Sequence, residues 1–450
     1  MKKLFGTDGI RGVANAYPMT ADAALQVGRA IALFFREKAD GNSIVIGQDT
    51  RISGDMLSAA LASGICATGC DVLLCGIIPT PAVAYHTAAA KANAGIVISA
   101  SHNPYYDNGI KVFGPDGFKL GDEEENALEK LITDTLAGPV DPGPRHTGRI
   151  RMISGAVEQY ADFLINSFPS GFTLNGMKII LDCAHGATFE AAPLVFKRLG
   201  AEVTPLFISP NGLNINDACG SQHPEVLSET VVEKGADAGL AFDGDGDRLI
   251  AVDETGRILS GDQILAVCAG YLFENGLLKN NKVVTTIMSN LGFKAAMNAA
   301  GIDHLMAQVG DRYVLEKMRA AGANLGGEDS GHMIFLDHHT TGDGMLAGLR
   351  LLEVVSQKKS PLSALGTVMT VFPQILMNIE VKEQPAIETV PEIQNAIEAV
   401  MTELGDRGRV LVRYSGTQPL CRVMVEGPTE LLTRQYCERI AAQVRKSIGI

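Results

Sequence analysis

Three aspartates separated by single glycines are the strongest chemical signal in this 450-residue sequence, where residues 243–248 read Asp-Gly-Asp-Gly-Asp-Arg. The carboxylates of Asp243, Asp245 and Asp247 can converge when the backbone is looped, and the glycines between them permit such a loop. Clustered carboxylates repel one another unless a cation binds between them. Hard oxygen ligands suit Mg²⁺, which keeps open positions for water or phosphate. The segment therefore predicts a magnesium site.

The same segment also fits the pattern of a calcium-binding EF-hand loop, because Glu254 stands at its twelfth place. Two features disagree with an EF-hand. Arg248 occupies the sixth place, where the sharp turn requires glycine. The flanking segments, 238–242 and 249–252, are strand-like rather than helical. We favour a magnesium site over an EF-hand, and a solvated acidic turn is the third interpretation.

A serine follows an apolar run in residues 95–104, which read Gly-Ile-Val-Ile-Ser-Ala-Ser-His-Asn-Pro. The consecutive β-branched residues 96–98 predict a strand that is buried on both faces, and the asparagine and proline mark its end. In parallel α/β sheets, chemistry takes place just beyond the carboxyl ends of the strands. Ser101, next to His102, is therefore a candidate nucleophile, and a polar turn is the alternative.

Two further segments of the N-terminal third carry candidate cations. Asn108-Gly109 predicts a turn and residues 111–113 a returning strand, which brings Lys111 close to Ser101. Residues 6–12, Gly-Thr-Asp-Gly-Ile-Arg-Gly, predict a flexible loop in which Arg11 is either solvated or offered to an anion. Another polar loop, residues 47–54, follows the predicted strand 44–46 and has no assigned role.

Two later segments combine hydroxyl and charged groups. Residues 326–332, Gly-Gly-Glu-Asp-Ser-Gly-His, offer Glu328 and Ser330 for hydrogen bonds to sugar hydroxyls, and His332 as a candidate proton shuttle. Residues 413–419, Arg-Tyr-Ser-Gly-Thr-Gln-Pro, together with Arg422, provide the cations, hydroxyls and flexible backbone that bind a phosphate dianion. A plain turn is the alternative for both segments.

The secondary-structure elements that must position these groups recur in a fixed order. Strand, polar loop and helix alternate through most of the chain, which predicts α/β domains with parallel strands and crossover helices. After residues 357–361 the order changes to strand, helix, strand, strand and helix, which predicts a small α+β domain. A chain of 450 residues is too long for one core, so three or more domains are expected.

Composition narrows the class of protein. The net charge of −13 argues against a nucleic-acid or anionic-membrane partner. The sequence contains no signal-peptide h-region and no run of about 18 apolar residues, so no transmembrane helix is expected. The eight cysteines are scattered, which is typical of a reduced, cytoplasmic protein.

The four polar motifs, at 99–104, 243–248, 326–332 and 413–417, resemble those of the α-D-phosphohexomutase superfamily in kind, order and spacing. The segments 5–12 and 99–104 are most similar to bacterial members that act on glucosamine phosphates. The resemblance implies three similar α/β domains with mixed sheets and a smaller α+β C-terminal domain around a central cleft. The implied boundaries are 1–153 with the phosphoserine loop, 154–254 with the metal loop, 255–368 with the sugar loop, and 369–450 with the phosphate-binding loop.

The resemblance also implies a role for each motif. Ser101 would carry a phosphoryl group as phosphoserine, and an oxygen of Ser101 or of its phosphate would join the three aspartates in binding Mg²⁺. The residues implied around the transferring phosphoryl group are Arg11, Lys111 and Arg248. The residues implied to read sugar hydroxyls are Glu328 and Ser330, with His332 nearby. The residues implied to grip the phosphate that is not reacting are Arg413, Ser415, Gly416, Thr417 and Arg422.

Three positions depart from the usual motifs of the superfamily. Tyr414 replaces a usual proline and Gln418 a usual glutamate in the phosphate segment, and neither change removes a phosphate donor. Gln418 makes the local field less negative. Asp329 adds a charge beside the sugar segment, which bears on the preference for an amino sugar.

The implied activity is the reversible conversion of glucosamine 6-phosphate to glucosamine 1-phosphate, which would supply amino sugar for UDP-N-acetylglucosamine and cell-wall synthesis. A hexosamine 1,6-bisphosphate would serve as intermediate and activator. The alternatives are a phosphomannomutase or phosphoglucomutase of the same superfamily, a metal-dependent sugar phosphatase, and a non-catalytic binding module. A small sugar phosphate is the expected partner, with no nucleic acid and no membrane, and the sequence leaves a homodimer open.

Overall fold

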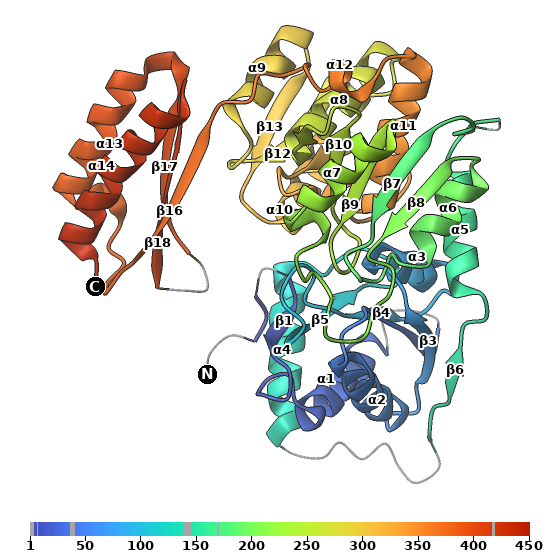
Figure 1. Cartoon of the computed structure of the whole chain (residues 1–450). Coiled ribbons are helices and arrows are strands. Elements are labelled where there is room, and N and C mark those ends of the chain that lie inside the picture. The colour runs from blue at the N-terminus through green and yellow to red at the C-terminus, as the bar shows by residue number, and fades with distance from the viewer. Residues whose placement is uncertain (1–3, 7, 37–40, 138–145, 170, 416–418) are drawn as a thin grey trace. The chain divides into compact units, whose positions relative to one another are not determined.

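The computed structural model describes residues 4–6, 8–36, 41–137, 146–169, 171–415 and 419–450 (Figure 1). The chain forms two compact units. The larger contains Met1–Ile287 and Ile302–Thr367, and the smaller contains Met288–Gly301 and Val368–Ile450. Three sheets lie in the larger unit and one in the smaller. None of the helices in the described ranges combines the length and the apolar run that crossing a membrane requires.

The first sheet has six strands in the order β1-β5-β4-β2-β3-β6. Its strands are β1 (Ile10–Val13), β2 (Ser43–Gln48), β3 (Asp71–Ile77), β4 (Ala94–Ile98), β5 (Asp107–Phe113) and β6 (Ile150–Met152). The predicted parallel pairing is confirmed for β2 with β3 and β4, but β5 runs antiparallel to β4. The connection 99–106 is too short for a crossover, which needs a dozen or more residues, so β5 must return antiparallel.

The polar N-terminal segment contains strand β1, so the prediction of a flexible loop through Gly12 was wrong. Ile10 pairs with Ile110, and Arg11 pairs with Gly109, in an antiparallel ladder with β5. Ile10 is also buried in the core of the first domain. The long-range partner therefore overrides the local turn preference of the glycines.

Helices α1 (Ala21–Phe35) and α2 (Ser53–Cys66) pack closely together. Thr20 caps α1, since its hydroxyl accepts a hydrogen bond from the backbone N–H of Ala23 at 3.3 Å. A Cβ atom at Gly28 of α1 would lie 2.3 Å from the carbonyl oxygen of Leu61 in α2. The small residue thus lets the two helix backbones approach. The other helices of this region are α3 (Thr80–Ala89) and α4 (Asp122–Ala137).

The second and third sheets repeat the mixed arrangement. The second, in the order β11-β10-β9-β7-β8, contains β7 (Lys178–Asp182), β8 (Glu202–Leu206), β9 (Ala238–Phe242), β10 (Leu249–Asp253) and β11 (Ile258–Leu259). The third, in the order β13-β12-β14-β15, contains β12 (Lys282–Thr286), β13 (Asp303–Ala307), β14 (Leu325–Gly327) and β15 (Met333–Phe335). The accompanying helices of the larger unit are α5 (Ala156–Asn166), α6 (Ala191–Arg198), α7 (Glu225–Lys234), α8 (Gly261–Glu274), α10 (Asp311–Ala321), α11 (Gly344–Lys358) and α12 (Leu362–Leu365).

Each of these three sheets contains a tight antiparallel return that carries a polar motif, and the second sheet has a further return from β10 to β11. The three returns with motifs join β4 to β5, β9 to β10, and β14 to β15. Their loops are 99–106, 243–248 and 328–332, and each carries one of the polar motifs. The predicted set of similar α/β domains with mixed sheets is confirmed, and the same local geometry presents a motif in each.

The smaller unit has a three-stranded antiparallel sheet in the order β16-β18-β17. Its elements are β16 (Gln374–Glu380), β17 (Arg409–Tyr414), β18 (Leu420–Glu426), α9 (Leu291–Ala300), α13 (Pro391–Leu404) and α14 (Glu430–Ile448). The buried apolar faces of α13 and α14 pack against the sheet in one core. The predicted α+β C-terminal domain is thereby confirmed.

Candidate active site

Ser101 lies just past the carboxyl end of β4, where the sequence predicted it. Its backbone is left-handed, with φ of 53°, and the residue is 1% exposed. Its hydroxyl donates a hydrogen bond to Oδ2 of Asp243 at 2.5 Å, and it lies 3.3 Å from Nδ1 of His102. Burial, together with Arg248 and Arg11, lowers the pKa of His102 to about 4, so the neighbouring imidazole is neutral near pH 7.

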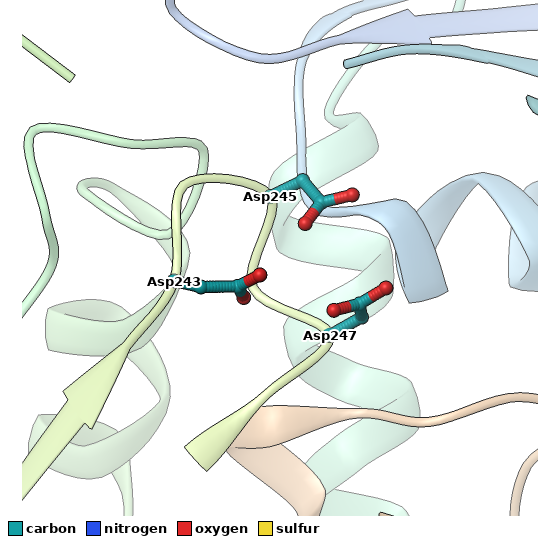
Figure 2. A group of neighbouring side chains, drawn as sticks. All are labelled: Asp243, Asp245 and Asp247. Carbon is teal, nitrogen blue, oxygen red and sulfur yellow. The ribbon is translucent and has the colours of Figure 1, made fainter. Parts of the chain in front are cut away.

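The three aspartates lie on the loop between β9 and β10, and their carboxylates gather on one side of it (Figure 2). One oxygen from each can be chosen so that all lie within 4.8 Å of one another. All three side chains are buried, and Oδ1 of Asp245 and Oδ1 of Asp247 have no hydrogen-bond partner among the described residues. Buried carboxylate oxygens without donors fit a hard cation.

Thr80 at the start of α3 holds the aspartate loop from the first domain. Its backbone N–H donates to the carbonyl oxygen of Asp245 at 2.9 Å, and its hydroxyl donates to Oδ2 of the same residue at 2.5 Å. Thr80 was not among the predicted site residues. No signal within one sequence links position 80 to position 245, since the contact is purely tertiary.

Lys111 on β5 enters the same cluster and is 2% exposed. Its ammonium lies 2.8 Å from Asp245, 3.3 Å from Asp247 and 3.0 Å from Asp8. Burial favours the neutral amine, but these carboxylates outweigh it and raise the pKa of Lys111 well above its usual value. The predicted nearness of Lys111 to Ser101 is confirmed, because both contact one aspartate loop.

The pKa values of Asp243 and Asp245 are shifted in opposite directions. Burial and the charges of Asp247 and Asp245 raise the pKa of Asp243 well above its usual value. Burial acts the same way on Asp245, but the ammonium of Lys111 and the hydrogen bond from Thr80 outweigh it, so the pKa of Asp245 is lowered. The ammonium of Lys111 thus compensates the charge of Asp245, whereas the surroundings of Asp243 disfavour its charged form.

Arg248 and His332 meet at this site from two neighbouring domains. Nε of Arg248 lies 3.9 Å from Oδ2 of Asp243 and 3.8 Å from Oδ1 of Asp247. The backbones of Arg248 and His332 form an antiparallel bridge. His332 is buried, and neither ring nitrogen has a hydrogen-bond partner within the described ranges, although Nε2 lies 3.5 Å from Oδ2 of Asp311. The described residues therefore leave both nitrogens of this buried ring without a hydrogen-bond partner.

Asp8 links the cations at the N-terminal side of the site. It pairs with Arg11 at 2.6 Å, with Lys111 at 3.0 Å and with Lys119 at 2.7 Å. Burial would raise the pKa of Asp8, but the three cations together hold it well below its usual value. Asp8 was missed as a site residue, although its place in the motif at 6–12 was the available signal. Lys119 also pairs with Asp311.

Glu328 and Ser330, in the segment 326–332 that was predicted to bind the sugar, differ in exposure. Oε1 of Glu328 accepts a hydrogen bond from the backbone N–H of Gly310 at 3.1 Å, and burial raises the pKa of Glu328. Ser330 is exposed. The carboxylate of Asp329 accepts a hydrogen bond from the backbone N–H of Asp262, in the first turn of α8, at 3.3 Å. A helix N-terminus thus partly satisfies the extra charge of Asp329.

In the smaller unit, Arg413 and Arg422 face each other across β17 and β18. One nitrogen of Arg422 lies 3.4 Å from the hydroxyl of Ser415. Burial and the charge of Arg422 lower the pKa of Arg413. Two adjacent guanidinium groups with a hydroxyl suit an anion. The predicted residues Gly416 and Thr417 lie outside the described residues, as does Gln418.

Four consecutive segments of the chain match models of the phosphoglucomutase/phosphomannomutase family. Residues 2–137 match its alpha/beta/alpha domain I, 138–256 its domain II, 260–372 its domain III, and 376–443 its C-terminal domain. Phosphoglucosamine mutases of Syntrophus aciditrophicus and Syntrophobacter fumaroxidans are 53% and 54% identical over 449 and 450 residues. Both alignments cover 100% of this chain and 100% of the relative.

Solved structures are similar over the same length. A phosphoglucomutase/phosphomannomutase family protein of Burkholderia thailandensis has a TM-score of 0.82 at 25% identity, with 100% of both chains covered. The Aspergillus fumigatus N-acetylphosphoglucosamine mutase, solved in complex with GlcNAc-6P and magnesium, has a TM-score of 0.71 at 18% identity, with 99% of this chain and 96% of that chain covered. The second likeness is one of fold.

Proposed function

Because the chain belongs to the phosphoglucomutase/phosphomannomutase family of α-D-phosphohexomutases, we propose that it interconverts glucosamine 6-phosphate and glucosamine 1-phosphate. The observation that carries this proposal is the hydrogen bond of 2.5 Å from the hydroxyl of Ser101 to Asp243, inside the cluster of three aspartates. A serine at that point can carry a phosphoryl group beside a cation site.

In the proposed cycle, phosphorylated Ser101 gives its phosphoryl group to the free hydroxyl of the sugar phosphate. The bond between phosphorus and the serine oxygen breaks as the bond to the sugar oxygen forms; the sugar hydroxyl gives its proton to a protein base, and the serine oxygen takes up a proton as it leaves. The product is a 1,6-bisphosphate, whose other phosphoryl group returns to Ser101 after the sugar turns around. His332 and Lys111 were the two candidates for moving the proton, and the unpartnered ring of His332 favours the histidine. The carboxylates around Lys111 raise its pKa well above the usual value, so Lys111 serves as a fixed cation beside the phosphoryl group.

Three aspartates, Asp243, Asp245 and Asp247, would hold Mg²⁺, and Ser101 or its phosphate would complete the ligands. The unpartnered oxygens of Asp245 and Asp247 support this assignment. A bound Mg²⁺ neutralises the charge that spreads over the transferring phosphoryl oxygens. Arg248 adds a fixed positive charge at the same place.

Substrate recognition is proposed to come from the remaining motifs. Glu328 and Ser330 read the sugar hydroxyls, and the facing pair Arg413 and Arg422, with Ser415, grips the phosphate that is not reacting. The boundaries at 153, 254 and 368 belong to the same proposal. All eight cysteines are free thiols in the structure, which supports a reducing, cytoplasmic setting.

Intact-protein mass, measured on the wild type and on Ser101→Ala, tests the carrier role. The wild type should gain the mass of one phosphoryl group after incubation with a hexose 1,6-bisphosphate. Ser101→Ala should gain none and should lose mutase turnover. The exposed Ser154→Ala is the matched control and should keep both properties. Phosphorylation of Ser101→Ala at wild-type level would overturn the proposal.

Turnover on glucosamine, glucose and mannose phosphates tests the substrate. We expect the amino sugar to have the highest kcat/KM. A strong preference for a neutral hexose would instead support a phosphoglucomutase or phosphomannomutase. Net phosphate release without isomerisation would support a phosphatase, in which water accepts the phosphoryl group from Ser101.

A further inference from the structure

We propose that Arg51 is a positioning residue for the reaction, which fixes the loop that carries Ser101. The inference rests on the proposed function for its kinetic consequence. Arg51 lies in the polar segment that follows β2, and it is 2% exposed, among the largest fully buried side chains of the described residues. Its guanidinium is directed at the backbone of the Ser101 loop and has no hydrogen bond to either Lys111 or the three aspartates in the described contacts.

All of the donors of the Arg51 guanidinium are engaged. Nε donates to Oδ2 of Asp49 at 2.9 Å. One terminal nitrogen donates to the carbonyl oxygens of Ser101 and Asn103 at 2.9 and 2.7 Å. The other donates to the carbonyl oxygens of Pro104 and Asp107, the latter at 3.1 Å. A guanidinium has five N–H groups in a rigid fork, and here each has an acceptor.

A second path runs from Arg51 to the amide of Ser101. Asp49, which pairs with Arg51, accepts a hydrogen bond from the hydroxyl of Ser99 at 2.5 Å. The same hydroxyl accepts a hydrogen bond from the backbone N–H of Ser101 at 2.9 Å. Arg51 therefore fixes both the amide and the carbonyl of Ser101, one through Asp49 and Ser99 and the other directly.

Asn216 holds the same loop from the second domain. Its side-chain amide donates to the carbonyl oxygens of Ser101 and Asn103 at 2.9 and 3.1 Å. These are two of the carbonyls that Arg51 also contacts. Donors from two domains thus converge on one short stretch of backbone.

The need for such fixation follows from the backbone of Ser101. Its φ of 53° lies in the left-handed region, which a serine leaves readily unless its surroundings hold it. The hydroxyl is directed at Asp243 in this conformation. A displacement of about 1 Å at a reacting group can cost about 100-fold in rate. Arg51 acts through Ser101 and touches no reacting atom, so its loss should lower kcat rather than weaken substrate binding.

Arg51→Lys is the primary test. Lysine keeps the charge opposite Asp49 but has only three donors on one nitrogen, so it cannot reach all four carbonyls. We expect kcat for glucosamine 6-phosphate to fall by about 10- to 100-fold, with KM unchanged within about twofold. We also expect slower phosphorylation of Ser101 by hexose 1,6-bisphosphate, followed by intact mass, and faster hydrogen exchange in residues 99–107.

Arg350→Lys is the matched control. Arg350 is also buried, pairs with Glu353 at 2.7 Å and donates to the carbonyl oxygen of Ser167 at 2.7 Å, but it contacts no residue of the Ser101 loop in the described structure. It should keep a wild-type kcat in its folded fraction. Equal kcat losses per folded molecule in both variants, or a wild-type kcat in Arg51→Lys, would overturn the proposal.

Asn216→Gly keeps the proposal testable if Arg51→Lys does not fold, because Asn216 is partly exposed and its φ of 59° lies in the left-handed region, which glycine adopts without strain. It removes the donors to the same two carbonyls, so it should show the same pattern of lower kcat and unchanged KM. An unaltered kcat in this variant would count against the proposal that hydrogen bonds to the carbonyls of Ser101 and Asn103 fix the loop. Hydrogen exchange in residues 99–107 measures the fixation of the loop without reference to activity. It therefore separates failure of this proposal from failure of the proposed mutase function.

Discussion

Asp243, Asp245 and Asp247 meet different partners within one loop, so their removal should have different effects. Asp243 accepts from Ser101, and Asp245 accepts from Lys111 and Thr80. Asp247 has the weakest contact of the three, at 3.3 Å from Lys111, and its other oxygen has no partner among the described residues. Asp247 is therefore the aspartate whose substitution tests metal binding with the least disturbance to the surrounding hydrogen bonds.

Asp247→Asn should weaken Mg²⁺ binding by at least about tenfold, because a neutral amide replaces an anionic ligand of a hard cation. Isothermal titration of Mg²⁺ into the unphosphorylated protein measures this directly, without reference to activity. The exposed Asp237→Asn changes the net charge equally and should bind Mg²⁺ like the wild type. An unchanged affinity in Asp247→Asn would remove Asp247 from the ligand set.

At the scale of elements, strands were predictable where their own residues decide the outcome. The buried strand β4 contains consecutive β-branched residues and is followed by polar ones, so both the strand and its end can be predicted from the local sequence. The edge strand β1 was missed because its glycine-rich segment becomes a strand only through pairing with β5. Strand β6 likewise pairs with β3, and its three residues, although two of them are apolar, are too few to predict a strand.

The contact between α1 and α2 gives an element-scale prediction. Gly28→Ala should destabilise the protein by roughly 1–3 kcal/mol, because the added Cβ would lie 2.3 Å from a backbone carbonyl and force the helices apart. Helix propensity alone predicts the opposite sign, since alanine is favoured over glycine by about 1 kcal/mol.

Gly270→Ala in α8 is the matched comparison, because a Cβ there meets nothing within 4 Å. We expect it to stabilise the protein by about 0.5–1 kcal/mol, as helix propensity predicts. Thermal unfolding of the two variants beside the wild type measures both effects. Similar shifts in the same direction would contradict the close approach of α1 and α2.

At the scale of the whole molecule, the polar motifs could be predicted from sequence, but the residues that join them could not. The aspartate loop, Ser101 and Lys111 stand in recognisable segments. Thr80, Asp8 and Asn216 act through partners more than 100 positions away, and no periodicity or local motif encodes such contacts. Only folding brings these groups together, so their contribution becomes visible at the level of tertiary structure.

The junction of the three α/β domains contains a buried histidine that should make stability depend on pH. Nε2 of His339 lies 2.9 Å from the carbonyl oxygen of Pro81 in the first domain, and its ring stands edge-on to Phe163 in the second. Nδ1 accepts a hydrogen bond from the backbone N–H of Thr340 at 2.8 Å. The neutral ring satisfies both nitrogens, whereas protonation would place a second N–H against a donor.

Burial lowers the pKa of His339 to about 4, below the ordinary histidine value of 6.5. The unfolded chain therefore binds this proton more readily than the folded protein does. The contribution of His339 to the free energy of unfolding is fully present above about pH 6.5 and is lost as the pH falls toward about 4, by at most about 3 kcal/mol.

His339→Gln keeps a neutral donor and acceptor and should flatten this part of the profile, whereas exposed His223→Gln should not. Denaturant unfolding from about pH 7.5 to about 4.5 measures the difference. If the free energy of unfolding changed with pH equally in the wild type and in His339→Gln, His339 would not be the source of the pH dependence.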